Sequence, residues 1–178
     1  MIVDDEPGLA DLYAAWLSGT YDVETATSGD DALDVIDETV DVVFLDRRMP
    51  GRSGDEVLVE LRDRGCDAAV ALVTAVDAGF DVLELPLDAY LAKPVERDAL
   101  TDAVERLRPR PTYDEPLRRY FSLVARRDAV EPATRPEDRE ADGAYGSLVA
   151  ELESLRAELD PDPTTLSETD AAAWDDEK

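Results

Sequence analysis

Five polar residues stand where predicted strands end, and their types are those that bind divalent metal ions and phosphate. Asp4 and Asp5 follow the apolar run MIV, Asp46 follows VDVVFL, Thr74 ends AVALVT, and Lys93 follows DAYLA. Reactive groups gather at the carboxyl ends of the strands in an open parallel sheet, so we expect these side chains on one rim. Three neighbouring carboxylates raise one another's pKa unless a cation neutralises them, and Mg²⁺ with oxygen ligands fits that requirement.

The second half of this set fits a phosphoryl group. Lys93 is one of two lysines in the chain, and its neighbours are apolar, which is unusual for a surface charge. An ammonium, the Thr74 hydroxyl and loop N–H groups suit phosphoryl oxygens. A carboxylate between a metal and such a pocket is placed to act as a nucleophile. Each residue alone has a commoner structural explanation, but their order and spacing together predict that Asp46 accepts phosphate.

The elements that must position these residues alternate along residues 1–108. Short apolar runs predict strands at Met1–Val3, Tyr21–Thr25, Val40–Leu45, Ala69–Thr74 and Leu87–Leu91. The segments between and after them predict helices at Pro7–Ser18, Ser28–Glu38, Gly54–Arg64, Asp77–Glu84 and Glu96–Arg108. Strands that alternate with helices predict a doubly wound α/β fold, in which a parallel sheet is covered on both faces.

Prolines at positions 109, 111 and 116 mark a change in organisation. They divide the chain into a first domain of residues 1–108, a Pro-rich linker of residues 109–116 and a helical segment of residues 117–178. Leu117–Val130 is predicted as a helix, and Glu131–Asp142, with two prolines and many charges, as a linker.

A second tail helix follows that linker. Its apolar residues repeat at three and four positions, the narrow seam of a coiled coil or a helical hairpin: Tyr145, Leu148, Leu152, Leu155 and Leu159. Two prolines in residues 160–165 end this helix, and Ser167–Asp170 is predicted to cap a last short helix near Trp174.

The composition is strongly acidic and restricts both location and chemistry. The 178 residues carry 44 acidic and 18 basic side chains, a formal net charge of −26. Molar salt screens such self-repulsion, so this composition predicts a salt-rich cytoplasm, as in salt-accumulating halophiles. The chain has no histidine and one cysteine, which excludes histidine triads, histidine zinc sites and disulfide frameworks. No apolar run is long enough for a membrane span, and we expect neither a membrane partner nor a signal peptide.

Four segments together resemble the receiver domain of two-component response regulators: VDDE at Val3–Glu6, LDRRMPGRSG at Leu45–Gly54, VTA at Val73–Ala75 and YLAKP at Tyr90–Pro94. The resemblance covers Met1 to about Arg108. It implies a CheY-like or flavodoxin-like sheet of order 2-1-3-4-5 with phosphorylation of Asp46 by a sensor histidine kinase. Such a protein is a switch rather than an enzyme, with at most intrinsic autophosphorylation and autodephosphorylation.

The same resemblance implies a role for each site residue. Asp5 and Asp46 would ligate Mg²⁺ together with the backbone carbonyl of Arg48, and Asp4 would act mainly through water. Thr74 and Lys93 would hold the phosphoryl oxygens. Tyr90 would be the aromatic switch residue, and Lys93–Pro94 a cis peptide bond.

The tail resembles the HalX domain found after haloarchaeal receivers, through TYDEPLRRYFSLVARRDAVE and the helix that follows it. This resemblance implies no biochemical activity. Because each tail helix offers only a narrow apolar stripe, we expect self-association or a protein partner through Leu148, Leu152 and Leu155.

Two other functions stay open at this point. A DNA-binding regulator would use the basic cluster of the tail, which consists of Arg118, Arg119, Arg126 and Arg127. A phosphatase of the haloacid dehalogenase type also forms an aspartyl phosphate, but its nucleophile comes before its acidic metal ligands, the reverse of the order here. Finally, only three residues precede Asp4, fewer than a strand usually has, so we expect the native start to lie upstream of Met1.

Overall fold

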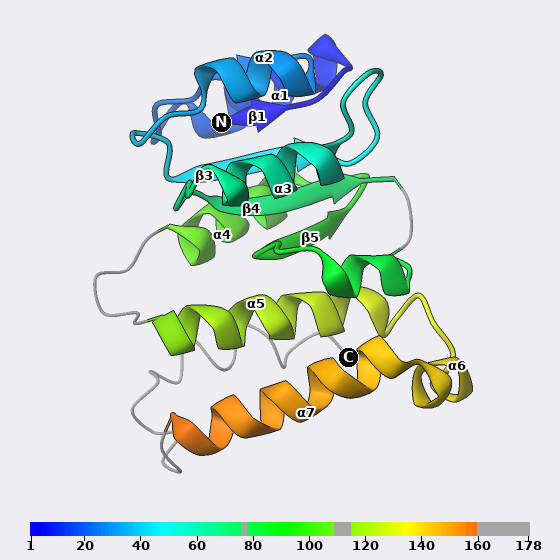
Figure 1. The fold of residues 1–178 in the computed structure, drawn as a ribbon. Coiled ribbons are helices and arrows are strands. Elements are labelled where there is room, and N and C mark those ends of the chain that lie inside the picture. Colours follow the sequence, from blue (N-terminus) through cyan, green and yellow to red (C-terminus); the bar gives the residue numbers. More distant parts are fainter. Residues whose placement is uncertain (76–77, 109–114, 160–178) are drawn as a thin grey trace.

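The computed structural model describes residues 1–75, 78–108 and 115–159, and its centre is a five-stranded parallel sheet (Figure 1). The strands lie in the order β2-β1-β3-β4-β5, as predicted. Their bounds are β1 Ile2–Val3, β2 Thr25–Ala26, β3 Val42–Asp46, β4 Ala69–Thr74 and β5 Ala89–Ala92. β2 shares only Thr25 with the predicted strand Tyr21–Thr25, because its position and length follow the pairing of Thr25 and Ala26 with the two residues of β1.

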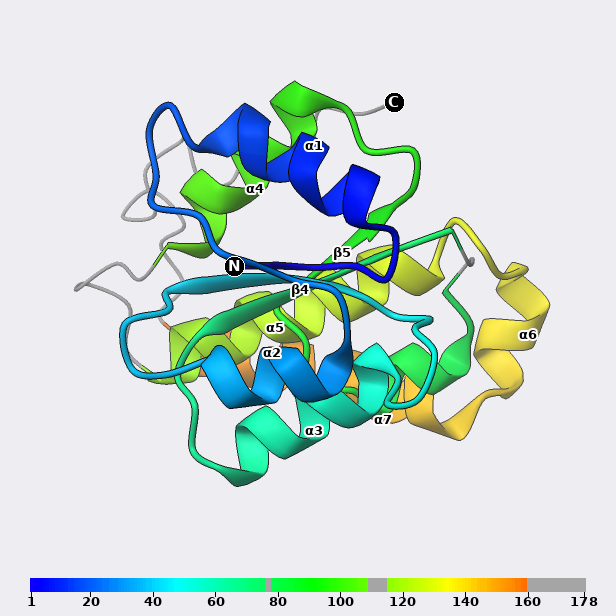
Figure 2. The ribbon, with the colours of Figure 1, turned by 90° about the horizontal axis from the view of Figure 1, so that it is seen from above.

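Helices cover both faces of the sheet (Figure 2). α1 (Pro7–Leu17) and α4 (Arg97–Leu107) lie on one face, and α2 (Gly29–Val35) and α3 (Gly54–Asp63) lie on the other. The central strand β3 serves both cores, since Val43 and Leu45 join one apolar cluster while Val42 and Phe44 join the other. A strand buried on both faces is apolar throughout, which explains the unbroken run that ends at Asp46.

The fourth predicted helix is wrong in kind. Where an α-helix was expected over Asp77–Glu84, the structure has a five-residue 3-10 helix, η1, at Phe80–Glu84, and Asp77 lies outside the described residues. Gly79 precedes this short helix and Pro86 follows it, and both residue types disfavour a continuing α-helix. The strands β4 and β5 therefore need another cover on this face.

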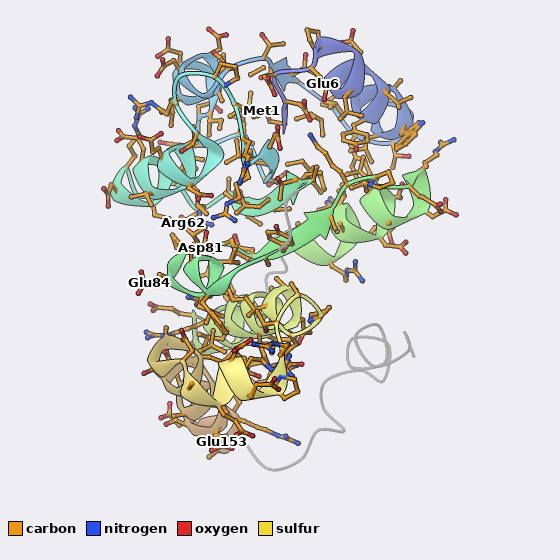
Figure 3. The ribbon with its side chains drawn as sticks, turned by 90° about the vertical axis from the view of Figure 1, so that its right-hand side faces the viewer. Met1, Glu6, Arg62, Asp81, Glu84 and Glu153 are labelled. Carbon is orange, nitrogen blue, oxygen red and sulfur yellow. The ribbon has the colours of Figure 1, made fainter. Side chains whose placement is uncertain are left out.

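The tail supplies that cover. α5 (Glu115–Val130) lies against η1 and β5, and α7 (Gly143–Glu158) packs beside α5 and also reaches η1. Figure 3 shows η1, with Asp81 and Glu84, between the sheet and these two tail helices. The hairpin alternative for the leucine seam is the one observed, and Leu148 and Leu152 are buried within the chain.

One expectation for the tail is wrong, and others lie beyond the described residues. The predicted linker Glu131–Asp142 contains the helix α6 (Pro136–Ala141), because a proline is tolerated in a first turn and Glu137 and Asp138 favour the positive helix start. Most of the Pro-rich linker, the break at residues 160–165 and the helix near Trp174 cannot be compared, since residues 109–114 and 160–178 are outside the described part.

The helices of the described residues also bear on membrane association. None of those within residues 1–75, 78–108 and 115–159 is both long and apolar enough to cross a membrane.

Candidate functional site

The predicted site residues meet at the carboxyl rim of the sheet. Asp46 is the last residue of β3, Thr74 is the last residue of β4, and Lys93 directly follows β5. Asp4 and Asp5 directly follow β1, and each can offer a carboxylate oxygen that lies within 4.8 Å of the other and of one from Asp46. The parallel topology thus brings together residues that are far apart in sequence, as the strand ends predicted.

Lys93 lies between two of the three carboxylates. Its Nζ is 2.7 Å from Asp4 Oδ2 and 3.4 Å from Asp46 Oδ1. Burial alone would lower the pKa of Lys93, but its hydrogen bond to Asp4 and the charge of Asp46 raise the pKa above the ordinary lysine value. Lys93 therefore stays protonated and offers a fixed positive charge to the rim.

Asp46 has the opposite balance. The residue is only 7% exposed, and burial raises its pKa, with a further rise from the charge of Asp4, although Lys93 opposes both. The backbone N–H of Arg48 also donates a hydrogen bond to the Asp46 carboxylate. A raised pKa means that the surroundings disfavour the ionised carboxylate, and an additional cation at the rim would stabilise it.

Asp4 and Asp5 differ in how much of each carboxylate is already used. Asp4 is buried and accepts hydrogen bonds from Lys93 Nζ and from the backbone N–H of Glu6, at 3.0 Å. Asp5 is less buried and belongs to the same three-carboxylate cluster. This arrangement suits a hard cation with oxygen ligands, with Asp5 more available than Asp4 for direct coordination.

The remaining predicted residues lie beside this cluster. Thr74 is buried, and its backbone carbonyl accepts a hydrogen bond from the backbone N–H of Lys93. Tyr90 is half-buried on β5, where it pairs in register with Leu72. The Lys93–Pro94 peptide bond is cis, as expected.

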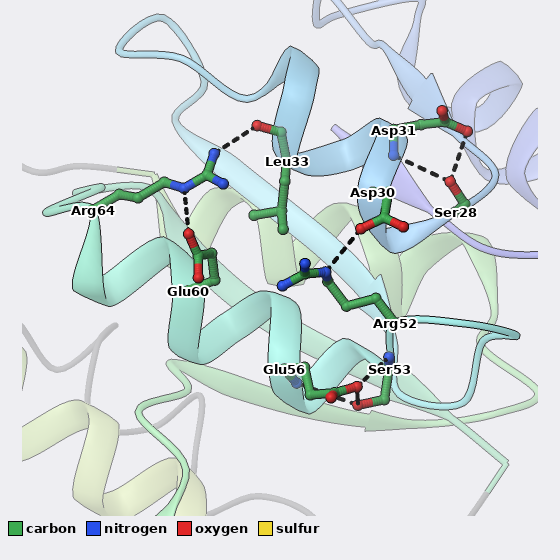
Figure 4. A network of polar contacts seen from close by, with 9 residues as sticks. All are labelled: Ser28, Asp30, Asp31, Leu33, Arg52, Ser53, Glu56, Glu60 and Arg64. Carbon is green, nitrogen blue, oxygen red and sulfur yellow. Dashed lines mark hydrogen bonds and ion pairs between the residues drawn. The ribbon is translucent and has the colours of Figure 1, made fainter.

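The loop after Asp46 is shaped by glycine and by a helix cap. A Cβ atom at Gly54 would lie 2.2 Å from the backbone oxygen of Asp46, so only glycine lets α3 start this close to the strand tip. The adjacent Ser53 and Glu56 form a capping box at the start of α3 (Figure 4). Gly51 has a φ of +78°, a conformation that favours glycine. These features fix the loop that follows Asp46.

Two arginines connect that loop and α3 to the neighbouring helix α2, as Figure 4 also shows. Arg52 Nε donates to Asp30 at 2.9 Å, and Arg64 Nη1 donates to the backbone carbonyl of Leu33 at 2.9 Å. Both contacts join α3 and its preceding loop to α2. Ser28 caps α2 by accepting a hydrogen bond from the backbone N–H of Asp31.

Sequence reasoning missed one residue beside Asp46. Arg47 directly follows Asp46, and its guanidinium forms ion pairs with Asp55 on α3 and with Asp81 on η1. Its position next to Asp46 was visible in the sequence. Its partner Asp81 was not, because 34 residues separate the two and their contact depends on the tertiary fold.

Comparisons with known proteins agree with this geometry. The family described as "Response regulator receiver domain" matches residues 1–105, and the HalX domain matches residues 109–173. A candidate transcriptional regulator of Haloferax volcanii is 45% identical over 159 residues, which are 89% of this chain and 27% of that protein. The transcriptional regulatory protein DltR of Streptococcus agalactiae is 36% identical over 115 residues, 62% of this chain and 51% of DltR. The chain thus spans between about a quarter and a half of these curated relatives.

Solved structures give the same fold. The response regulator TrrA of Thermotoga maritima in complex with Mg²⁺-BeF is 35% identical with a TM-score of 0.53, over 60% of this chain and 95% of that one. The BeF3-activated receiver domain of DrrB is 28% identical with a TM-score of 0.55, over 60% and 92%. The chemotaxis protein CheY4 of Vibrio cholerae is 24% identical with a TM-score of 0.56, over 60% and 94%, and shows the fold alone.

Proposed function

This chain belongs to the response regulator receiver family and carries a HalX domain after its receiver, and on that premise we propose that Asp46 accepts a phosphoryl group from a sensor histidine kinase. The observation that supports this proposal best is the rim itself. Three carboxylates lie within 4.8 Å of one another, and Lys93 bridges Asp4 and Asp46. Receivers are signalling switches, so the chain is not an enzyme in the ordinary sense.

The reaction that we propose is an in-line displacement at phosphorus. A carboxylate oxygen of Asp46 forms the new O–P bond while the P–N bond to the kinase histidine breaks, and the electron pair stays on the imidazole nitrogen. Lys93 then pairs with a phosphoryl oxygen, and the Thr74 hydroxyl donates to another. Tyr90 turns toward the space that Thr74 vacates, which makes it the switch residue.

Mg²⁺ is the cofactor that fits this donor set. We propose Asp5, Asp46 and the backbone carbonyl of Arg48 as direct ligands, with Asp4 acting through water, because the Asp4 carboxylate already accepts two hydrogen bonds. When bound, Mg²⁺ would neutralise the clustered carboxylates and the phosphoryl oxygens. Asp5→Ala should therefore weaken Mg²⁺ binding more than Asp4→Ala, and equal or reversed effects would show that these two assignments are wrong.

The experiment that tests the acceptor is labelling with a small phosphodonor and Mg²⁺ at molar KCl. Asp46→Asn should abolish labelling, and EDTA should block it in the unchanged protein. Asp34→Asn, which removes an exposed carboxylate on α2, is the matched control and should label normally. Full labelling of the Asp46→Asn protein would refute the assignment.

We propose the domain division of residues 1–108, 109–116 and 117–178, with Glu115 and Pro116 already in the first turn of α5. The output of the tail is a proposal as well. Leu148 and Leu152 are buried against the rest of the chain, so self-association or partner binding through them requires the hairpin to move.

Direct DNA binding is the second candidate, because curated relatives are named as transcriptional regulators. Most arginines of the basic cluster that would bind DNA already form ion pairs or hydrogen bonds within the chain. Arg119 pairs with Glu151, Arg127 pairs with Asp128, and Arg126 donates to backbone carbonyls. A duplex-binding assay at molar KCl, with and without phosphorylation, separates a DNA-binding tail from a protein-binding one.

A further inference from the structure

On one side, the short helix η1 contacts the loop of residues 47–53, which follows Asp46 and which we call the acceptor loop. Its residue Asp81 forms an ion pair with Arg47, the residue directly after Asp46. The Arg47 side chain is only 11% exposed, and Nε and Nη2 also donate to the Asp55 carboxylate at 3.0 Å. Arg47 therefore joins η1 to the loop of the acceptor and to the start of α3.

The HalX hairpin, which we define as α5 with α7, contacts η1 from the other side. Arg126 Nη1 on α5 donates to the backbone carbonyl of Leu83 at 3.0 Å. Ser122 Oγ donates to the backbone carbonyl of Leu87, just before β5, at 2.5 Å. Val82 and Leu83 are buried in the cluster that includes Leu123. The hairpin is thus docked on η1 and on the segment before β5 by hydrogen bonds from two side chains to backbone carbonyls, and by apolar packing.

We infer that Arg47 is a positioning residue that couples the phosphoacceptor loop to the docking of the HalX hairpin, through its ion pair with Asp81. This inference rests on the proposed phosphorylation of Asp46. Because Arg47 ties Asp81 to the acceptor loop, η1 follows that loop when it rearranges around a phosphoryl group. The carbonyl of Leu83 then withdraws from Arg126, and the docking of the hairpin weakens.

Phosphorylation supplies the perturbation that this coupling needs. It adds roughly −1.5 to −2 charge and three acceptor oxygens at Asp46, next to Lys93 and Thr74. When the docking of the HalX hairpin weakens, apolar residues of α7 become exposed. Leu148 and Leu152 are among them, and both are buried while the hairpin is docked. A coupling of this kind is reciprocal, so loosening the hairpin must also favour occupancy of the acceptor site by the same factor.

The two acidic partners of Arg47 provide a matched pair of variants. Asp81→Asn removes the negative charge and therefore the ion pair that links Arg47 to η1, and the Asp81 side chain is 62% exposed, so the variant should fold. Asp55→Asn removes an ion pair from the same guanidinium but leaves the link to η1 in place. A merely structural role for Arg47 predicts similar behaviour of the two variants, whereas the coupling role predicts that only Asp81→Asn uncouples the hairpin.

The test is hydrogen exchange of the full chain at molar KCl, with Mg²⁺ and with or without beryllofluoride as the phosphoryl mimic. In the unchanged protein and in Asp55→Asn, beryllofluoride should accelerate exchange in α5 by about fivefold or more. Asp81→Asn and Arg47→Met should show no acceleration, and Arg47→Lys, which keeps the charge, should restore part of it. Undocking by Arg126→Met should tighten beryllofluoride binding, but not in the Asp81→Asn background.

Fluorine NMR of the bound beryllofluoride shows whether a negative result refutes the proposed function or only the coupling through Arg47. If the unchanged protein binds no beryllofluoride, or if Asp46→Asn binds it equally well, the proposed function is refuted and this inference with it. If beryllofluoride binds at Asp46 but exchange in α5 does not change, or if Asp81→Asn responds like the unchanged protein, the coupling through Arg47 alone is refuted.

Discussion

Asp46→Asn should stabilise the folded protein when Mg²⁺ is withheld. With an effective dielectric constant of about 20, like charges 4.8 Å apart repel by about 3.5 kcal/mol, and opposite charges 3.4 Å apart attract by about 5 kcal/mol. Asp46 faces two repulsions of at least this size, because 4.8 Å is the upper limit of the distances to Asp4 and Asp5 within the cluster, and one such attraction, from Lys93. The repulsions exceed the attraction, and burial also disfavours the ionised carboxylate, so the free energy of unfolding should rise by about 2 kcal/mol in EDTA.

The extra stability of Asp46→Asn should depend on pH and should decrease as the pH falls. The pKa of Asp46 is raised by burial and by the charge of Asp4, so the folded protein holds this proton more tightly than the unfolded chain does. Ionised Asp46 therefore costs stability at neutral pH, and the cost disappears as the pH falls below the ordinary carboxyl range. The advantage of Asp46→Asn should be largest near pH 7 and should shrink on acidification.

With Mg²⁺ present, the unchanged protein should become more stable than Asp46→Asn. Free Mg²⁺ at 100 times its dissociation constant would stabilise the unchanged protein by about 2.7 kcal/mol, and Asp46→Asn, which lacks one of the proposed ligands, should gain much less. Urea unfolding at fixed molar KCl, followed by tryptophan fluorescence, measures both effects, with Asp34→Asn as the control. The reasoning is wrong if Asp46→Asn is less stable than the unchanged protein in EDTA, or if Mg²⁺ stabilises both equally.

Three further predictions concern the scaffold of the site. Gly54→Ala should destabilise the protein by about 1–3 kcal/mol and slow labelling, because its Cβ would meet the acceptor backbone, whereas Gly8→Ala, with open space around it, should do neither. Arg62→Met should cost roughly 3 kcal/mol in urea unfolding at pH 7 by removing the cation beside Asp88. Burial already raises the pKa of Asp88, so this cost should fall near pH 4.5, and a constant cost would contradict it. A fragment that ends at Arg108 should unfold at lower urea than the full chain, and an equal midpoint would contradict the role of the tail as a cover.

The fold and the rim of the site could be predicted because both depend on local patterns. Apolar runs identify buried strands, and the parallel topology then places every strand end on one edge. Asp46, Thr74 and Lys93 were recognisable as strand-end residues before their distances were known. Gly54 was visible in the same way, as the last residue of the motif LDRRMPGRSG.

The parts that failed depend on contacts between distant segments. Apolar residues at Phe80, Val82 and Leu83 fit an α-helix, but they form the short 3-10 helix η1, against which α5 and α7 pack. The pairing of Arg47 with Asp81 and the hydrogen bond from Arg126 to the carbonyl of Leu83 leave no periodic signal. The sequence predicted the two long tail helices, but it did not indicate that they would pack on the receiver.

The way in which the hairpin is docked suits the salt-rich cytoplasm that the composition predicts. At molar salt the Debye length is roughly 3 Å, so exposed charges act on one another only when they are in contact. A signal carried from Asp46 by long-range attraction would be lost under those conditions. Direct ion pairing of Arg47 with Asp81, hydrogen bonds to the backbone carbonyls of Leu83 and Leu87, and apolar burial all act at contact distance. The coupling that we propose between Asp46 and the tail therefore relies on contacts that molar salt leaves in place, while the net charge of the chain keeps separate copies apart only where salt is low.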